Sequence, residues 1–176
     1  IPRPIIGYLG NIERRIDYEL VQALATLHPD KHFVFTGPIE KEFVPDWFFQ
    51  IPNIHLTGRI DYDRLPALLK GFDVAILPFK KDAVSRTIFP LKLFEYLGAG
   101  KPTISTNFNP DLHSFTADAV TYCADVQSFS EAIQSALQND TETLITKRVA
   151  IAKENTWEKR ALEISNAIED YLYHQK

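Results

Sequence analysis

The sequence has little of what disulfide-stabilised, metal-binding or membrane-spanning proteins need. Its one cysteine, Cys123, excludes a disulfide framework and a metal site built from several cysteines. That cysteine stands in the apolar run AVTYCA, where a free thiol behaves as a small core residue. No apolar run approaches the roughly 18 residues that cross a membrane, and no signal-peptide pattern opens the chain. A reducing cytoplasm fits these absences.

Charge and length narrow the function classes further. The net charge of −4 excludes a globally basic nucleic-acid binder, so we expect no nucleic-acid partner. The 176 residues, 45% of them apolar, can bury the core of a single domain. Because the chain has no methionine and opens with IPRPIIGYLG, we expect a piece of a longer protein in which residues 1–3 are an interdomain linker.

Apolar runs alternate with helical patterns along the chain. We expect strands within residues 4–10, 32–37, 54–58, 73–79, 102–107 and 119–124. Strands separated by helices predict right-handed βαβ units and an α/β fold with a doubly wound, Rossmann-like parallel sheet. Such a sheet has the strand order 3-2-1-4-5-6.

The intervening helices have recognisable starts and faces. Asp17 is the expected N-cap of a helix over residues 17–29, with Leu20, Leu24 and Leu27 on one face. An aspartate of the DYD at 61–63 is expected to cap the next helix, which turns Leu65, Leu68 and Leu69 inward. Ser128 and Glu131 read as a capping box. Residues 156–176 predict an amphipathic C-terminal helix whose apolar face carries Trp157, Ala161, Ile164, Ile168 and Tyr171.

Ligands of doubly wound sheets bind outside the carboxyl ends of the strands, where the strand order reverses. Here those ends are Gly10–Asn11 and Pro78–Lys80, and the segment FPLKLFEYLGAGKP at 89–102 begins about ten residues after the second. Pro90 suits the first turn of a helix, and Gly100 suits the position just past its end. Free amides near Leu91 and Lys92 would then form an anion site at the positive end of the helix dipole.

The charge pattern supports an anionic ligand the size of a diphosphate. Between residues 80 and 92 the cations Lys80, Lys81, Arg86 and Lys92 face only Asp82, and Arg14 and Arg15 follow the first strand toward the same crevice. One turn into the helix, the carboxylate of Glu95 can accept two hydrogen bonds from a sugar diol such as a ribose. The alternative is an exposed ion pair between Lys92 and Glu95, worth only tenths of a kcal/mol, for which the apolar neighbours leave little solvated surface.

Taken together, residues 6–38, 51–80, 90–106 and 155–160 resemble the C-terminal, nucleotide-sugar-binding domain of a GT-B glycosyltransferase of the large group that includes family 4. The resemblance implies that Glu95 contacts the ribose and that the amides of Leu91 and Lys92 contact the diphosphate. It also implies that the loop at Gly10 and Asn11 closes over the donor and that Arg59 lies near the base. The candidate nucleotide-sugar-binding residues are Gly10, Asn11, Arg14, Arg15, Arg59, Lys80, Arg86, Thr87, Pro90, Leu91, Lys92 and Glu95.

The sequence departs from that family at two places. Thr87 stands where retaining members carry a second glutamate, and Asn11 and Asp17 stand where they carry a basic pair, for which Arg14 and Arg15 are the available substitutes. The donor sugar, the base, the acceptor, the anomeric outcome and the catalytic base therefore stay open.

Other signals favour structural roles. The DYD motif also matches a metal-binding D-x-D, but capping is the favoured reading and we predict no metal. His28, His32, His55, His113 and His174 lack ligand partners at helical spacing, although His113 could face the crevice. Ser105 and Thr106 lack a nucleophile elbow. The dinucleotide fingerprint is absent after the first strand, which argues against NAD.

Our first hypothesis is the donor half of a glycosyltransferase that needs no metal or cofactor. The resemblance implies that an N-terminal domain outside this sequence carries the acceptor site and the base, and that peripheral contact with the inner face of the membrane would come from such absent parts. The second hypothesis is a nucleotide-sugar-binding module without transfer, either an epimerase half or a degenerate regulatory domain. A third is a flavodoxin-like interaction domain that binds no nucleotide.

Overall fold

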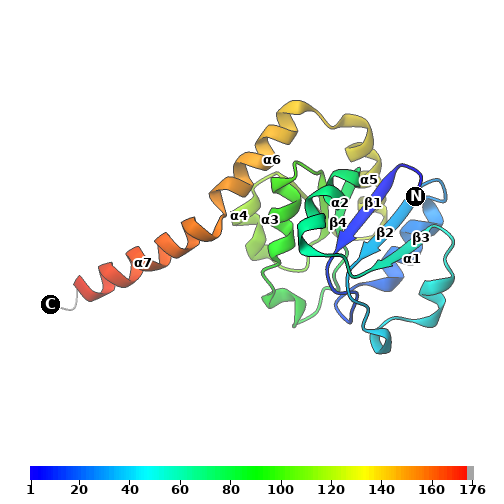
Figure 1. The fold of residues 1–176 in the computed structure, drawn as a ribbon, viewed down its shortest axis with the longest axis horizontal. Helices are drawn as coiled ribbons and strands as arrows, with labels where there is room; N and C mark the ends of the chain where they lie inside the picture. The colour runs from blue at the N-terminus through cyan, green and yellow to red at the C-terminus, as the bar shows by residue number, and fades with distance from the viewer. Residues whose placement is uncertain (174–176) are drawn as a thin grey trace.

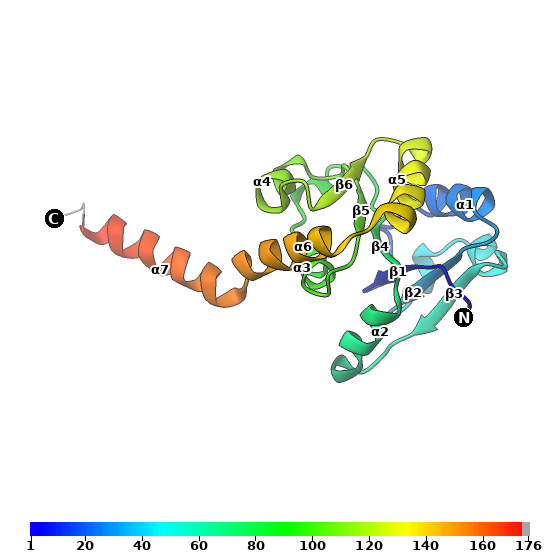
Figure 2. The same ribbon diagram turned by 90° about the horizontal axis from the view of Figure 1, so that it is seen from above.

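A six-stranded, all-parallel sheet forms the centre of the molecule in a computed structural model, which describes residues 1–173 (Figures 1 and 2). Its strand order is β3-β2-β1-β4-β5-β6, which confirms the predicted doubly wound sheet. The strands are β1 (Ile5–Leu9), β2 (His32–Thr36), β3 (Ile54–Gly58), β4 (Val74–Leu77), β5 (Thr103–Thr106) and β6 (Val120–Cys123).

Seven α-helices occur within residues 1–173, with five short 3₁₀ turns between the strands and helices. The helices are α1 (Tyr18–Leu27), α2 (Leu65–Gly71), α3 (Leu91–Gly98), α4 (His113–Thr116), α5 (Val126–Asn139), α6 (Glu142–Glu154) and α7 (Trp157–Tyr173). The 3₁₀ turns are Lys41–Phe43, Asp46–Gln50, Tyr62–Arg64, Ser85–Thr87 and Pro110–Leu112. The sequence patterns had not predicted α4 or α6.

The sheet is covered on both faces, as an all-parallel sheet requires. Helices α1 and α5 lie on one side, while α2 and α3 lie on the other (Figure 2). All four residues of β4 are buried, which explains why this strand is apolar without alternation. Cys123 is buried at the end of β6, as its apolar surroundings predicted.

Helix starts follow the predictions only in part. Asp17 caps α1 by accepting a hydrogen bond from the Leu20 amide. Leu20 and Leu24 are buried, but the prediction for Leu27 was wrong, because this last residue of α1 is 54% exposed.

Two capping predictions were wrong because the helices begin elsewhere. Helix α5 starts at Val126, so its capping box joins Asp125 to Ser128, and Glu131 instead accepts a hydrogen bond from Gln127. A 3₁₀ turn separates the DYD segment from α2, and Asp61 at its start makes no capping hydrogen bond through its side chain. Of the three leucines predicted to face inward in α2, only Leu69 is fully buried.

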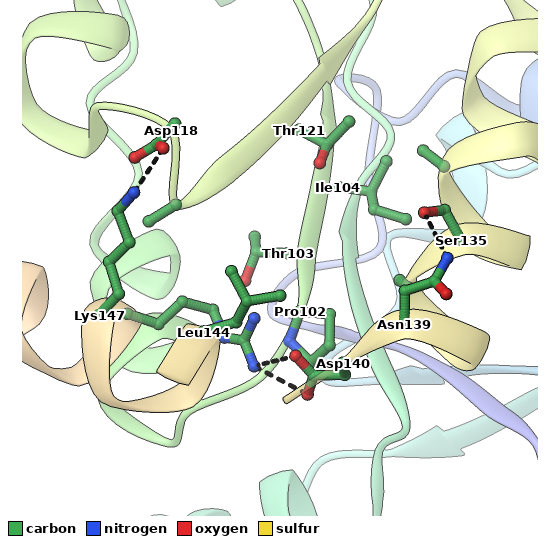
Figure 3. A pocket seen from close by; sticks show the side chains of 14 residues that line it. Pro102, Thr103, Ile104, Asp118, Thr121, Ser135, Asn139, Asp140, Leu144 and Lys147 are labelled. Atoms are coloured by element: carbon green, nitrogen blue, oxygen red, sulfur yellow. Dashed lines mark hydrogen bonds and ion pairs between the residues drawn. The ribbon is translucent and has the colours of Figure 1, made fainter. Parts of the chain in front are cut away.

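Helix α6 packs against the core through apolar side chains such as Ile151 and Ala152, and it also carries one buried guanidinium. The Nε of Arg148 donates to the Gly100 carbonyl at 2.9 Å, and its Nη2 donates to both carboxylate oxygens of Asp140 at 2.7 and 2.8 Å. Arg148 and Asp140 line a pocket of about 220 Å³ at the amino ends of β5 and β6 (Figure 3). This pocket therefore lies at the edge of the sheet opposite the predicted ligand site.

Helix α7 projects away from the rest of the molecule (Figures 1 and 2). It contains no buried residue, and the apolar side chains of its predicted face lie in solvent. Residues 174–176 of the predicted 156–176 helix, with His174, lie outside the described residues. Within residues 1–173, no helix combines the length and the apolar character that crossing a bilayer requires.

Candidate functional site

A cavity of about 700 Å³ lies at the carboxyl ends of β1, β2 and β3 and against the start of α3. This volume is within the usual range for small-molecule sites. The strand ends contribute Leu9, Gly10, Thr36, Gly37, Pro38, Arg59, Ile60 and Phe79, and the loop after β1 adds Arg15. The remaining wall consists of Leu65 in α2, the segment Ile88–Lys92 and Glu95.

Seven of the twelve predicted site residues line this cavity: Gly10, Arg15, Arg59, Pro90, Leu91, Lys92 and Glu95. The other five, Asn11, Arg14, Lys80, Arg86 and Thr87, are exposed and do not line it. Asn11 instead contacts the Glu40 carboxylate, and the Thr87 hydroxyl donates to the Val84 carbonyl at 2.9 Å. A role for these five in ligand contact stays a prediction.

Backbone forms much of the cavity wall because two glycines turn the chain sharply at the strand ends. Gly10 and Gly37 have φ values of +131° and +145°, which side-chain-bearing residues rarely adopt. The Gly10 amide donates to the Thr36 carbonyl, and a Cβ on Gly37 would lie 2.1 Å from the Gly10 carbonyl oxygen. The ends of β1 and β2 are thus in close contact, and a ligand can approach their backbone.

Helix α3 presents its first turn to the cavity. Pro90 directly precedes the helix rather than opening it, and Gly100, with a φ of +71°, stands just past its end as predicted. Tyr96 fastens α3 to β1, because its hydroxyl accepts a hydrogen bond from the Leu9 amide at 2.7 Å. The amides at the start of α3 therefore face the cavity from a fixed position.

The Lys92 side chain turns toward β1. Its Nζ lies 2.8 Å from the Tyr8 hydroxyl oxygen, 4.3 Å from the centre of the Tyr8 ring and 5.4 Å from that of Phe79. Burial of the ammonium group, reinforced by the positive charge of Arg15 and opposed by Glu95, lowers the pKa of Lys92 to about 7. The alternative of an ion pair with Glu95 was wrong, because the lysine contacts tyrosine instead.

Glu95 lies on the cavity rim with its side chain exposed. The expectation that apolar neighbours would leave little solvated surface was wrong. Leu93, Tyr96 and Leu97 face the core, whereas Leu91 and Glu95, one turn apart, face outward. Glu95 also lines a neighbouring hollow of about 560 Å³ between α3 and the start of α7.

The charges around the cavity favour an anion. Arg15, Arg59 and Lys92 line it together with one carboxylate, Glu95. Arg15 forms an ion pair with Glu13, and its guanidinium carbon lies 5.7 Å from the centre of the Phe79 ring. Arg59 lies at the mouth. An anionic group near the start of α3 would thus meet both side-chain cations and a helix dipole.

Sequence reasoning missed several residues of this site. They are Tyr8, Thr36, Gly37 and Pro38. Phe79 and Phe89 lie in segments that were predicted to border the site, although neither was named as a site residue. The Gly-Pro pair after the second strand is a turn signal that could have identified Gly37 and Pro38. Nothing in the strand pattern of β1 distinguishes Tyr8 from an ordinary core residue.

The remaining candidates contact protein groups. His113 hydrogen-bonds Asn107 at 3.0 Å and stacks on Tyr122, and the Thr106 hydroxyl donates to the Phe79 carbonyl at 2.6 Å. His32 and His55 contact each other across β2 and β3 at 2.9 Å. Within residues 1–173, no three His, Cys, Asp or Glu side chains gather as metal ligands would. Independence of metal nevertheless stays a prediction.

Residues 3–139 match the family described as glycosyl transferases group 1. Over 107 residues, 58% of this chain and 26% of the relative, the chain is 35% identical to TuaH of Bacillus subtilis (strain 168), named as a candidate glycosyltransferase of teichuronic acid biosynthesis. The chain thus matches about a quarter of the length of that curated relative.

Solved structures share the fold at low identity. Anabaena HepE in complex with UDP is 18% identical with a TM-score of 0.68, and the match covers 95% of this chain and 48% of HepE. HepE with UDP-glucose gives the same TM-score at 17% identity over the same shares of the two chains. The N-terminal domain of Candida albicans trehalose-6-phosphate phosphatase is 13% identical with a TM-score of 0.71, over 99% of this chain and 42% of that one. These structures show that the sheet is arranged as in one half of a GT-B fold.

Proposed function

The chain belongs to the group 1 glycosyl transferases, and on that premise we propose that it is the donor-binding half of an enzyme that transfers a sugar from a nucleotide diphosphate sugar. The observation that carries the proposal is the cavity at the start of α3, where three basic side chains and the helix dipole converge and one carboxylate stands at the rim. HepE, which shares the fold, was solved with UDP and with UDP-glucose, so these nucleotides are the first probes.

In this proposal the ligand lies along the first turns of α3. The amides of Leu91 and Lys92 hold the diphosphate at the positive end of the helix. Glu95, one turn further, accepts hydrogen bonds from the ribose hydroxyls, and Arg59 lies near the base. The glycine turns at Gly10 and Gly37 let the diphosphate approach the backbone.

The proposed chemistry breaks the bond between the sugar's anomeric carbon and the diphosphate oxygen, while an acceptor nucleophile bonds to that carbon and gives up its proton to the catalytic base. The bonding electrons pass to that oxygen, and the departing nucleotide diphosphate gains negative charge. Fixed positive groups around the start of α3 stabilise this developing charge without reorganising, which is electrostatic preorganisation. Because side chains and backbone supply this charge, we propose a transfer that needs no metal.

The acceptor and the catalytic base are proposed to belong to an N-terminal domain of the same polypeptide. The chain spans about half the length of the HepE chain that shares its fold, which leaves room for such a domain. The isolated chain should then bind nucleotide weakly and transfer nothing. Transfer by the 176-residue chain alone would contradict this division of labour.

A second function is a nucleotide-sugar-binding module without transfer. It is favoured by Thr87, which replaces the second glutamate of retaining relatives and does not line the cavity. Assays of a longer protein containing this chain for transfer, donor hydrolysis and epimerisation would separate the two functions.

Calorimetric titration of UDP and GDP into the wild type and Glu95→Ala tests the donor site. Loss of a charged hydrogen-bond acceptor should weaken binding by about 1.5 kcal/mol, the lower end of the usual range, because this carboxylate is exposed. The control is Glu131→Ala, which removes an exposed carboxylate on α5 that does not line the cavity. Equal affinity of Glu95→Ala and wild type would contradict the ribose role. Failure of the wild type to bind any nucleotide diphosphate would overturn donor binding and favour the interaction-domain hypothesis.

A further inference from the structure

Lys92 is a cation at the wall of the cavity that has no carboxylate partner within the described residues. Its Nζ contacts the Tyr8 hydroxyl and the faces of two aromatic rings, and none of the ion pairs formed within residues 1–173 includes it. The charged and titratable groups that face it are Tyr8 on β1, Arg15 in the following loop and Glu95 on its own helix. Of these, only Glu95 is negative, and its carboxylate lies in solvent on the outer face of α3.

This environment disfavours a permanent charge. Partial removal of an ammonium group from water without a counter-ion costs free energy, and the like charge of Arg15 adds to that cost. The resulting pKa of about 7 means that the free protein holds both the charged and the neutral amine near neutral pH.

We propose that Lys92 takes up a proton when the diphosphate of a nucleotide sugar binds, and that its ammonium is then the ligand's buried counter-charge. This inference rests on the proposed function, since it needs a diphosphate in the cavity. A diphosphate within a few ångströms favours the charged form of the amine, as an opposite charge does at such a distance. The proton comes from solvent, and no bond of the ligand breaks in this step.

The same lysine also positions the loop after β1. The Tyr8 hydroxyl accepts from Lys92 Nζ and donates to the Asn11 carbonyl at 2.9 Å, so one hydrogen-bond chain joins the amine to that loop. Gly10 leaves the space that the amine occupies, because a Cβ there would lie 2.1 Å from Nζ. The charge of Lys92 is thus linked to the backbone that walls the cavity.

UDP-glucose is the appropriate probe, because its diphosphate has no terminal phosphate with a pKa near 6 that would release protons of its own. Its binding to the 176-residue chain is measured by calorimetry at about pH 7.5 in buffers of different ionisation enthalpy. The expected result is an uptake of about 0.5 to 0.7 proton per ligand bound for a pKa rise of one to two units, and an affinity that falls by up to about tenfold per pH unit above about pH 7. Lys92→Arg, which stays charged, should bind without proton uptake and with no such pH dependence.

Two outcomes overturn the inference and are distinguishable. Measurable binding of UDP-glucose without proton uptake rejects the lysine's role and leaves the proposed function standing. If the chain binds none of UDP-glucose, UDP and GDP, the proposed function fails and the inference fails with it.

NMR of lysine labelled at Cε gives a second readout on the wild-type chain, which matters if Lys92→Arg does not fold. One lysine should titrate near pH 7 in the free protein, and its pKa should rise by about one unit or more with saturating UDP-glucose. Absence of such a resonance, or a titration that UDP-glucose leaves unchanged, rejects the proposal.

Discussion

At the scale of single residues, the partial burial of the Lys92 amine beside Tyr8 should favour binding of an anionic ligand, but it destabilises the empty fold. In the unfolded chain the Lys92 amine has a pKa of about 10.4, whereas burial lowers it to about 7 in the folded protein. Between these values the unfolded state binds more protons, so the free energy of unfolding rises with pH. Below about pH 7 both states carry the charge and the full cost of burying it is present.

Lys92→Met should therefore stabilise the empty chain at about pH 7 more than at about pH 9. Urea denaturation at both values measures the difference, and the wild type should gain stability over this interval relative to the variant. Lys153→Met, which removes an exposed lysine from α6, is the matched control and should follow the wild type. Parallel pH profiles for wild type and Lys92→Met would show that the amine stays charged in the folded state.

Gly10 offers a second residue-scale prediction. Gly10→Ala places a Cβ 2.1 Å from Lys92 Nζ at a φ of +131°, so it adds both backbone strain and crowding of the amine. We expect a loss of about 2–3 kcal/mol of stability and weaker binding of UDP-glucose. Gly58→Ala is the control, because Gly58 also has positive φ but a Cβ at that position would have no other atom within 4 Å. Equal effects of the two substitutions on binding would argue against a role for the space beside Lys92.

The sequence predicted the residue types of this site better than it predicted the orientations of their side chains. The spacing of Lys92 and Glu95 left an exposed ion pair open as the alternative to ligand binding, but the Lys92 side chain reaches back to β1 and Glu95 stays on the rim. The cause is a tertiary contact, since Tyr8 lies 84 positions earlier in the chain. Helical periodicity describes the neighbours within α3 and contains no information about a partner on another strand.

At the scale of elements, we expect Arg148 to contribute much of the free energy that holds α6 against the domain. The residue is 5% exposed, and its guanidinium donates to Asp140 and to the carbonyl of Gly100, which follows α3. Arg148→Met would leave Asp140 without its partner and the Gly100 carbonyl without its donor. Removing one partner of such a buried pair should cost on the order of 3 kcal/mol.

Urea denaturation of Arg148→Met checks this value. The neighbouring Lys147→Met is the matched control, because Lys147 pairs with Asp118 in an exposed ion pair that water and salt screen (Figure 3). A loss for Arg148→Met no larger than that for Lys147→Met would mean that α6 is held by its apolar contacts instead.

Runs of apolar and β-branched residues predicted all six strands. The signal is clearest for β4, whose four residues are all apolar and buried. Helix α6 escaped prediction since its one fully buried residue is Arg148, a residue type that usually signals a surface. The excess of positive charge in the segment 80–89 was the reason to assign Lys80 and Arg86 to the site, yet neither residue lines the cavity. A count of charges along the sequence does not show whether the side chains of a loop face the cavity or the solvent.

At the scale of the whole molecule, strand order places the site. Because β1 pairs with β4, the two halves of the chain add their strands in opposite directions across the sheet. The resulting crevice was predictable from the alternation of strands and helices alone. The loop after β2 was not predicted, because Gly37 and Pro38 reach the cavity only through the level ends of three paired strands. Arg59, which follows β3, was expected at the site from the family resemblance alone.

Helix α7 is the part of the molecule that its own domain does not cover. Leu162, Ile164, Ile168 and Leu172 are each more than half exposed, along a helix with no buried residue. Apolar side chains exposed along one helix favour association in water, so we expect the chain to self-associate as its concentration rises. Truncation after Ala161 should abolish this self-association. It should change the free energy of unfolding by less than about 0.5 kcal/mol, because the removed residues contribute nothing to the core.

Light scattering coupled to gel filtration, over a range of concentrations, and urea denaturation measure the two effects of truncation separately. Ile164→Ser combined with Ile168→Ser keeps the full length and removes only apolar surface, so it should reduce association as truncation does. A wild-type chain that stays monomeric at every concentration would contradict the expected association. A truncated chain that loses several kcal/mol would show that α7 stabilises the domain despite its exposure, and the fold would then depend on a helix that projects from it.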